Sequence, residues 1–229
     1  MTADGFPDDA DGPAVRVPPL RGRELGPLAR LTAAVTARAT GGDAPRFITT
    51  LGRHRRLFRH WLPFSASLLL RGDLPAEDRE LVVLRTAWRC GAWYEWAHHA
   101  TLGVEAGLAP EDVERVAGGP SAPGWSDRQR TLLRATDEMH DRRVVGDETW
   151  PALAGELSPP ELVELCLLVG HYEMLAMTLN SLGTAPEPST LARLRPADRV
   201  RAGELRDQLT ARRRAVTEPR PGDPRPGTP

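Results

Sequence analysis

The chain is poor in cysteine, tyrosine and lysine. Among 229 residues there are two cysteines and two tyrosines, and lysine is absent. Two cysteines, Cys90 and Cys166, are too few for a disulfide framework and fit a reducing compartment, although one bridge between them stays open. All basic residues are therefore arginine, and the net charge is -1. A balanced charge implies no bulk attraction to nucleic acid or to a membrane.

Targeting and spanning segments are also lacking. No apolar run approaches the roughly 20 residues that cross a bilayer. Near the N-terminus stand Asp4, Asp8, Asp9 and Asp11, where a signal peptide would need basic residues followed by an apolar stretch. We therefore expect a cytoplasmic protein with neither a membrane nor a nucleic-acid partner.

Several chemical signatures are missing as well. The sequence has no convincing strand pair, glycine-rich phosphate loop, nucleophile elbow or zinc-finger spacing. The adjacent His98 and His99 do not face one metal from a helix, and no third ligand has metal spacing, so we expect no metal. Hydrophobic residues make up 40% of the chain, enough for a sizeable core. The fold class expected from these patterns is all-α.

The composition divides the chain into three parts. Residues 1–22 are rich in Pro, Gly and Asp and predict a disordered leader. Residues 23–190 carry helical periodicity and predict one helical domain. Residues 191–229 predict a charged peripheral helix followed by a disordered tail. Within the domain, helices are expected over 27–40, 45–61 (ended by Pro63), 75–90, 93–106, 126–143 and 158–182, with short ones near 110 and 150.

The expected helix over 158–182 is apolar on most sides, so it should be central. It has more hydrophobic surface than one small domain covers, which favours packing between subunits. His171 in this helix is expected to be a hydrogen-bonded core residue.

The segment 90–99, Cys-Gly-Ala-Trp-Tyr-Glu-Trp-Ala-His-His, is the densest polar and aromatic cluster. Glu95 and His99 are four residues apart and so lie on one helical face, where a carboxylate can orient an imidazole for proton transfer. Tyr94 and His98 form the adjacent pair, and Trp96 can exclude water. A plain alternative is a solvated helix-stabilising pair with tryptophans in the core.

These residues carry a resemblance to a known family. Residues 75–107, with Arg-Glu-Leu-Val-Val-Leu-Arg at 79–85 and Tyr-Glu-Trp-Ala-His-His at 94–99, resemble the core of the carboxymuconolactone decarboxylase-like (alkylhydroperoxidase D-like) family. Residues 165–188 resemble the C-terminal half of its members. The resemblance implies the family's helical bundle and a homo-oligomer, a trimer or a multiple of trimers.

The peroxidase branch of that family has a glutamate on one helix and Cys-x-x-Cys-x-x-x-His on the next. Carried over, the glutamate falls on Glu80 and the histidine on His99, whereas the cysteine positions hold Ala92 and Glu95. That chemistry needs an attacking thiolate and a resolving thiol. The motif supplies neither, so the chain resembles a branch that lacks the Cys-x-x-Cys motif.

The decarboxylase branch of the family uses no metal and no organic cofactor, and it acts on a small lactone acid in the catabolism of aromatic compounds, so the resemblance implies that this chain needs no cofactor. The resemblance implies a lyase in which His99 moves a proton, with Glu95 or Glu80 as its carboxylate partner. Arg85 is the local candidate for holding a substrate carboxylate bidentately. Tyr94, His98 and Trp96 complete the expected substrate site.

Two alternatives stay open. One is a thiol-dependent hydroperoxide reductase, which would need Cys90 to react with an outside resolving thiol. The other is a non-catalytic oligomeric binding protein, in which Glu95 and His99 pack at an interface or face water.

Overall fold

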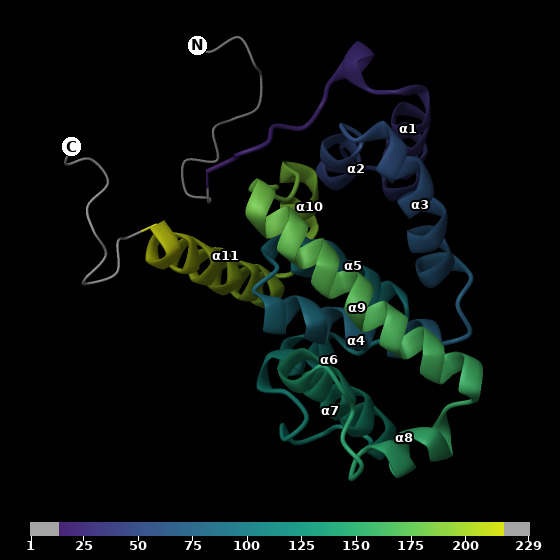
Figure 1. Cartoon of the computed structure of the whole chain (residues 1–229). Helices are drawn as coiled ribbons and strands as arrows, with labels where there is room; N and C mark the ends of the chain where they lie inside the picture. Colours follow the sequence, from purple (N-terminus) through teal and green to yellow (C-terminus); the bar gives the residue numbers. More distant parts are fainter. Residues whose placement is uncertain (1–13, 218–229) are drawn as a thin grey trace, which may run out of the picture.

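The computed structural model describes residues 14–217, which fold into helices with no strand among them. This confirms the all-α fold class (Figure 1). The helices are α1 (Pro27–Thr40), α2 (Arg46–Leu51), α3 (Arg55–Leu70), α4 (Ala76–Cys90), α5 (Trp93–Glu105), α6 (Pro110–Arg115), α7 (Asp127–Arg142), α8 (Trp150–Glu156), α9 (Pro159–Leu182), α10 (Pro188–Arg193) and α11 (Pro196–Thr217), with 3₁₀ turns at Gly22–Glu24 (η1) and Val116–Gly118 (η2).

Helix α4 is the centre of the bundle, because it packs against α5, α7 and α9 at once. Leu81 and Leu84 face the core beside α5 and α11, and Val82 and Val83 face a second core beside α7 and α9. All four are completely buried. Figure 1 shows α9 crossing α4 and α5 diagonally. The three helices that carry the candidate site residues are therefore held against one another by apolar contacts on two sides.

Helix α9 has clear ends and an apolar middle. Glu161 accepts a hydrogen bond from the Ser158 N–H at its start, and Gly183 ends it with a φ of 75°. Among the described residues, α9 is the one helix long and apolar enough to cross a membrane, which corrects the expectation that no run was long enough. Charged and polar residues such as Glu164 and His171 are buried against the other helices, so we interpret α9 as a core helix.

The predicted helix over 45–61 is wrong in its boundaries. The chain breaks at Gly52 instead, and α3 runs through Pro63. A Cβ at Gly52 would lie 2.8 Å from the Ala29 Cβ, so close packing against α1 fixes the corner here. His54 restarts the helix, because its Nδ1 accepts a hydrogen bond from the Leu57 N–H. Tertiary packing thus outweighs the helix-breaking tendency of proline.

Both ends of the predicted domain need correction. Residues 1–13 and 218–229, predicted to be disordered, lie outside the described residues. Residues 14–22, however, belong to the structure: the N–H groups of Arg16 and Val17 both donate to the Leu182 carbonyl. At the other end, the predicted single peripheral helix is two helices, and Leu205 of α11 is fully buried against α5.

Candidate active site

The turn between α4 and α5 brings two predicted residues together. Gly91 ends α4 with a φ of 63°, in the left-handed region that glycine adopts without strain, and α5 starts two residues later. Gly103 then lets the helices approach closely, since a Cβ there would lie 3.1 Å from Leu84 and Leu108 side-chain atoms. In the resulting antiparallel pair, Glu80 of α4 lies opposite His99 of α5.

Glu80 and His99 form a buried ion-pair contact. The Glu80 Oε2 is 2.6 Å from the His99 Nδ1, and the side chains are 2% and 9% exposed. Burial opposes ionisation of Glu80, but the charge and hydrogen bond of His99, with help from Arg79, lower the pKa of this carboxyl below its usual value. An ionised Glu80 accepts a hydrogen bond from the Nδ1–H of His99, which leaves the other ring nitrogen, Nε2, on the side of the ring away from Glu80.

Glu95 does not pair with His99, which corrects the predicted i, i+4 partnership. Neither of its carboxyl oxygens has a hydrogen-bond partner among the described residues, and its side chain is buried. Burial raises the pKa of Glu95 well above its usual value. Burial of this kind favours the neutral, protonated form of the carboxyl. The pKa values of Glu80 and Glu95 are therefore shifted in opposite directions, as those of acid–base pairs in enzymes often are.

An aromatic layer closes the site on the side of α3 and α9. The Tyr172 ring meets the His99 ring edge to face, with centroids 5.1 Å apart. Burial raises the pKa of Tyr172, and the Glu80 and Glu95 carboxyls raise it further, so all three groups lie close together. His171 follows, stacked on Trp61 at 5.8 Å. This layer covers one side of His99, whose side chain stays 9% exposed.

His171 is a core residue, as predicted, but aromatic contacts hold it in place of the predicted hydrogen bond. Its Nδ1 has no partner within the described part of the chain. Burial lowers the pKa of His171 to about 4. Tyr172, which the sequence analysis missed, had one available signal: it is the neighbour of His171 in the apolar helix.

Tyr94 and His98 lie away from His99 and meet Glu187, which corrects their predicted role in binding substrate. The Tyr94 hydroxyl donates to Glu187 Oε1 at 2.7 Å, and the His98 Nε2 is 2.7 Å from Oε2. Burial opposes the charge on Glu187, but His98 and further hydrogen bonds lower its pKa to about 2. Glu187 precedes α10 in a loop without periodicity, so no sequence pattern indicated it.

Arg85 is also engaged elsewhere. Its Nε and Nη2 donate to both carboxylate oxygens of Asp137 at 2.7 and 2.8 Å, and its Nη1 donates to the Val116 carbonyl. These contacts contradict the predicted role in holding a substrate carboxylate. Trp96 is completely buried and packs on Trp88, with ring centroids 5.5 Å apart, so it belongs to the core. Arg79, whose Nε is 3.3 Å from Glu80, is the arginine that contacts the pair.

Both thiols lie outside this arrangement. Cys90 and Cys166 are free and come from α4 and α9. Burial, with the Glu95 and Glu173 carboxyls, raises the pKa of Cys90 to about 12. The thiol is therefore protonated at neutral pH, which makes it a poor nucleophile.

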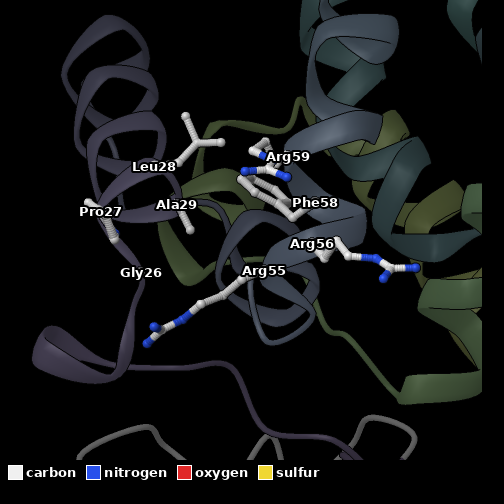
Figure 2. Close-up of a pocket in the computed structure, with 9 residues that line it drawn as sticks. Gly26, Pro27, Leu28, Ala29, Arg55, Arg56, Phe58 and Arg59 are labelled. Atoms are coloured by element: carbon white, nitrogen blue, oxygen red, sulfur yellow. The ribbon is translucent and has the colours of Figure 1, made fainter.

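Two surface cavities are found away from the Glu80–His99 pair. A cavity of about 350 Å³ lies between α1 and α3, and one of about 470 Å³ lies beside α7, α8 and α9. Figure 2 shows Ala29 and Phe58 facing each other in the first, with Arg55 and Arg56 extending in opposite directions. His99 is in the lining of neither cavity.

Comparisons with known proteins agree with this geometry. Residues 55–138 match the sequence model described as the carboxymuconolactone decarboxylase family, and this range contains Glu80, Glu95 and His99. None of the curated proteins matches the chain.

Solved structures share the fold at low sequence identity. An alkylhydroperoxidase AhpD core protein from Ralstonia eutropha JMP134, called an uncharacterized peroxidase-related protein, is 19% identical, with a TM-score of 0.70 over 78% of this chain and 95% of its own. A cysteine-to-alanine variant of the debrominase Bmp8, in complex with 2,3,4-tribromopyrrole, is 15% identical, with a TM-score of 0.66 over 85% of this chain and 100% of its own.

A third structure, from Agrobacterium tumefaciens, is a protein of unknown function called a putative antioxidant defence protein AhpD. It is 15% identical, with a TM-score of 0.53 over 57% of this chain and 90% of its own. At these identities the likeness concerns the fold. The family model matched over residues 55–138 and the shared fold together support a carboxymuconolactone decarboxylase-like, or AhpD-like, core in this chain, with Ala92 and Glu95 in place of the two motif cysteines.

Proposed function

We propose that the protein is a lyase that decarboxylates a small carboxylate- or lactone-bearing molecule by acid–base chemistry. The observation that carries this proposal is the buried Glu80–His99 contact of 2.6 Å; the helix of His99 also holds Glu95, a carboxyl whose pKa is raised by burial. The family's decarboxylase name supports the reaction class. The residues that a thiol mechanism needs are absent from the motif, whereas those of a proton relay are present.

In the proposed step the substrate loses CO₂ and gains a proton from His99. The substrate C–C bond breaks, CO₂ leaves, and the electron pair remains on the substrate carbon, delocalised into an adjacent unsaturated carbonyl. The protonated His99 then delivers its Nε2 proton to that carbon, and the imidazole is reprotonated from solvent. Ionised Glu80 stabilises the imidazolium and fixes its orientation. In this scheme Arg79 replaces Arg85 as the group that holds the substrate carboxylate before it leaves.

The test is a screen of small unsaturated lactone acids for CO₂ release, followed by variants of the pair. His99→Gln and Glu80→Gln should each lower kcat by about 10²- to 10⁴-fold, the usual contribution of a positioned acid or base. His98→Gln is the matched control, because His98 contacts Glu187 and lies outside the relay. Activity that survives His99→Gln, in a variant with an unchanged circular dichroism spectrum, would refute the assignment.

The runner-up function is thiol-dependent reduction of hydroperoxides. It is favoured by the peroxidase-related name of the structure from Ralstonia eutropha. It predicts hydroperoxide consumption, with an external thiol as reductant, that is lost in Cys90→Ser and retained in Cys166→Ser. The protonated state of Cys90 argues against it. Such Cys90-dependent consumption, with no CO₂ release from any lactone acid, would reverse the order of the two proposals.

We also propose that the protein assembles as a homo-oligomer, a trimer or a multiple of trimers, in the cytoplasm. Helix α9 exposes large apolar side chains on its outer face: Val163, Leu167, Met174 and Met177. Exposed apolar surface of this kind marks interfaces. Light scattering after gel filtration should give a mass above 25.1 kDa, and Leu167→Glu should lower it. A monomer at micromolar concentration would contradict the proposal.

A further inference from the structure

Three side chains with metal-ligating atoms converge outside the acid–base site. Cys90 ends α4, His140 lies in the last turn of α7, and Glu173 lies in the middle of α9. The Cys90 Sγ is 3.8 Å from the His140 Nδ1, and that nitrogen is 2.8 Å from the Glu173 Oε1. All three ligand atoms lie within 4.8 Å of one another.

Contacts outside the cluster hold two of the three residues, Glu173 and the backbone of Cys90. Arg143 pairs with the second oxygen of Glu173, which leaves Oε1 directed at the cluster. The Cys90 carbonyl accepts hydrogen bonds from Asn180 Nδ2 at 3.3 Å and from Arg212 Nη1 at 3.1 Å. The Arg143–Glu173 contact is of the kind that orients a metal ligand, and the contacts to the Cys90 carbonyl hold the end of α4 in place.

The donor set matches zinc. A thiolate, an imidazole and a carboxylate are the three ligand types of zinc sites in proteins, with bonds of about 2.3 Å to sulfur and about 2.0 Å to nitrogen or oxygen. Tetrahedral bonds of these lengths place sulfur and nitrogen about 3.5 Å apart. The observed 3.8 Å is close to that value. The His140–Glu173 contact is shorter, as a hydrogen bond must be, and would lengthen by a few tenths of an ångström around an ion.

We propose that Cys90, His140 and Glu173 bind one zinc ion per chain, at a site separate from the Glu80–His99 pair. Three protein ligands leave a fourth position for water, as in zinc sites that are not purely structural. The groups are partly exposed, with side-chain exposures of 22% for His140 and 14% for Glu173, so the ion can enter from solvent. Binding joins the ends of α4 and α7 to the middle of α9 and releases the thiol proton.

Cobalt(II) gives the sharpest test, because it replaces zinc and reports its ligands by colour. Chelator-treated full-length protein titrated with Co²⁺ should develop a thiolate-to-cobalt charge-transfer band and intense tetrahedral d–d bands. Both should saturate at one equivalent and disappear when zinc is added. Cys90→Ser should abolish the charge-transfer band, and His140→Gln should weaken binding by more than the roughly 10- to 100-fold expected for an outer-shell partner.

Matched controls are available in the same chain. Cys166→Ser removes the other, exposed thiol, and His60→Gln removes an exposed histidine of α3; both should bind cobalt as the wild type does. A second readout is stability: zinc should raise the melting temperature of the wild type and leave that of Cys90→Ser unchanged.

Three results would overturn the proposal. They are the absence of any charge-transfer band at excess cobalt, a band that persists in Cys90→Ser, and equal zinc affinity in His140→Gln and wild type. Each readout is independent of catalytic activity, so failure of the zinc site and failure of the proposed lyase function are distinguishable.

Discussion

Replacing Arg85 tests whether this residue is a structural partner of Asp137, as the structure shows, or the substrate-binding residue that the sequence predicted. In Arg85→Met, the carboxylate of Asp137 loses its two hydrogen bonds of 2.7 and 2.8 Å, and the Val116 carbonyl loses its donor. Only the Arg89 Nε, 3.7 Å away, remains beside Asp137. The variant therefore leaves a largely buried charge without its main partner.

The expected cost follows from this geometry. Breaking a buried ion pair by removing one partner costs about 3–5 kcal/mol. Since the Asp137 side chain is 17% exposed and Arg89 stays near it, we expect the lower end, about 3 kcal/mol. For a chain of this size each kcal/mol lowers the melting temperature by roughly 2–4 °C, so a fall of about 6–12 °C should result.

Denaturant unfolding monitored by circular dichroism measures this loss. The double variant Arg85→Met with Asp137→Leu should recover much of it, because it removes the stranded charge as well. The free energy of unfolding of Arg85→Lys should lie between those of the wild type and Arg85→Met, since lysine keeps the charge but loses the bidentate geometry. A loss below about 1 kcal/mol for Arg85→Met, the value of a surface pair, would refute this reasoning and reopen the substrate-binding role.

Three further predictions concern other contacts. The lowered pKa of Glu187 stabilises the fold by about 3 kcal/mol above pH 4.5. The melting temperature of Glu187→Gln should therefore differ from that of the wild type above pH 4.5, and the two values should converge as the pH falls toward 2. A constant difference in melting temperature across this pH window would contradict the prediction. In chelator-treated native protein Cys166 should react with a thiol reagent before Cys90, and Cys166→Ser should remove the fast phase; an equally fast Cys90 would contradict its burial. Gly183→Ala should cost more than about 1 kcal/mol, since φ is 75° and a Cβ would strike the Ala14 carbonyl, whereas Gly155→Ala, with open space around it, should be neutral or stabilising.

The sequence by itself determined the helical class, the family that the core resembles and the positions of the central helices. Periodicity placed α4, α5, α7 and α9 within a few residues, because proline, acidic first turns and terminal glycines mark helix ends locally. Spacing within the matched motif pointed to Glu80 and His99, and substitution at Ala92 and Glu95 excluded the motif thiols.

Only the tertiary structure decided which groups are partners. Periodicity within α5 predicted that Glu95 pairs with His99. Because α4 packs beside α5, Glu80 is the carboxylate that contacts His99, and Glu95 is buried with no hydrogen-bond partner among the described residues. In the same way, Arg85 pairs with Asp137 of α7. Tyr94 and His98 both contact Glu187, an acidic residue in a loop where no periodic pattern could have indicated it.

The cluster of Cys90, His140 and Glu173 also forms only through the packing of helices that are distant in the sequence. The expectation of no metal rested on local ligand spacing, and these residues are 50 and 33 positions apart along the chain. Their meeting depends on how three helices pack, and packing is set by long-range contacts among apolar side chains. A sequence pattern reports what neighbours on one helix share, whereas burial, protonation and partnership arise between helices.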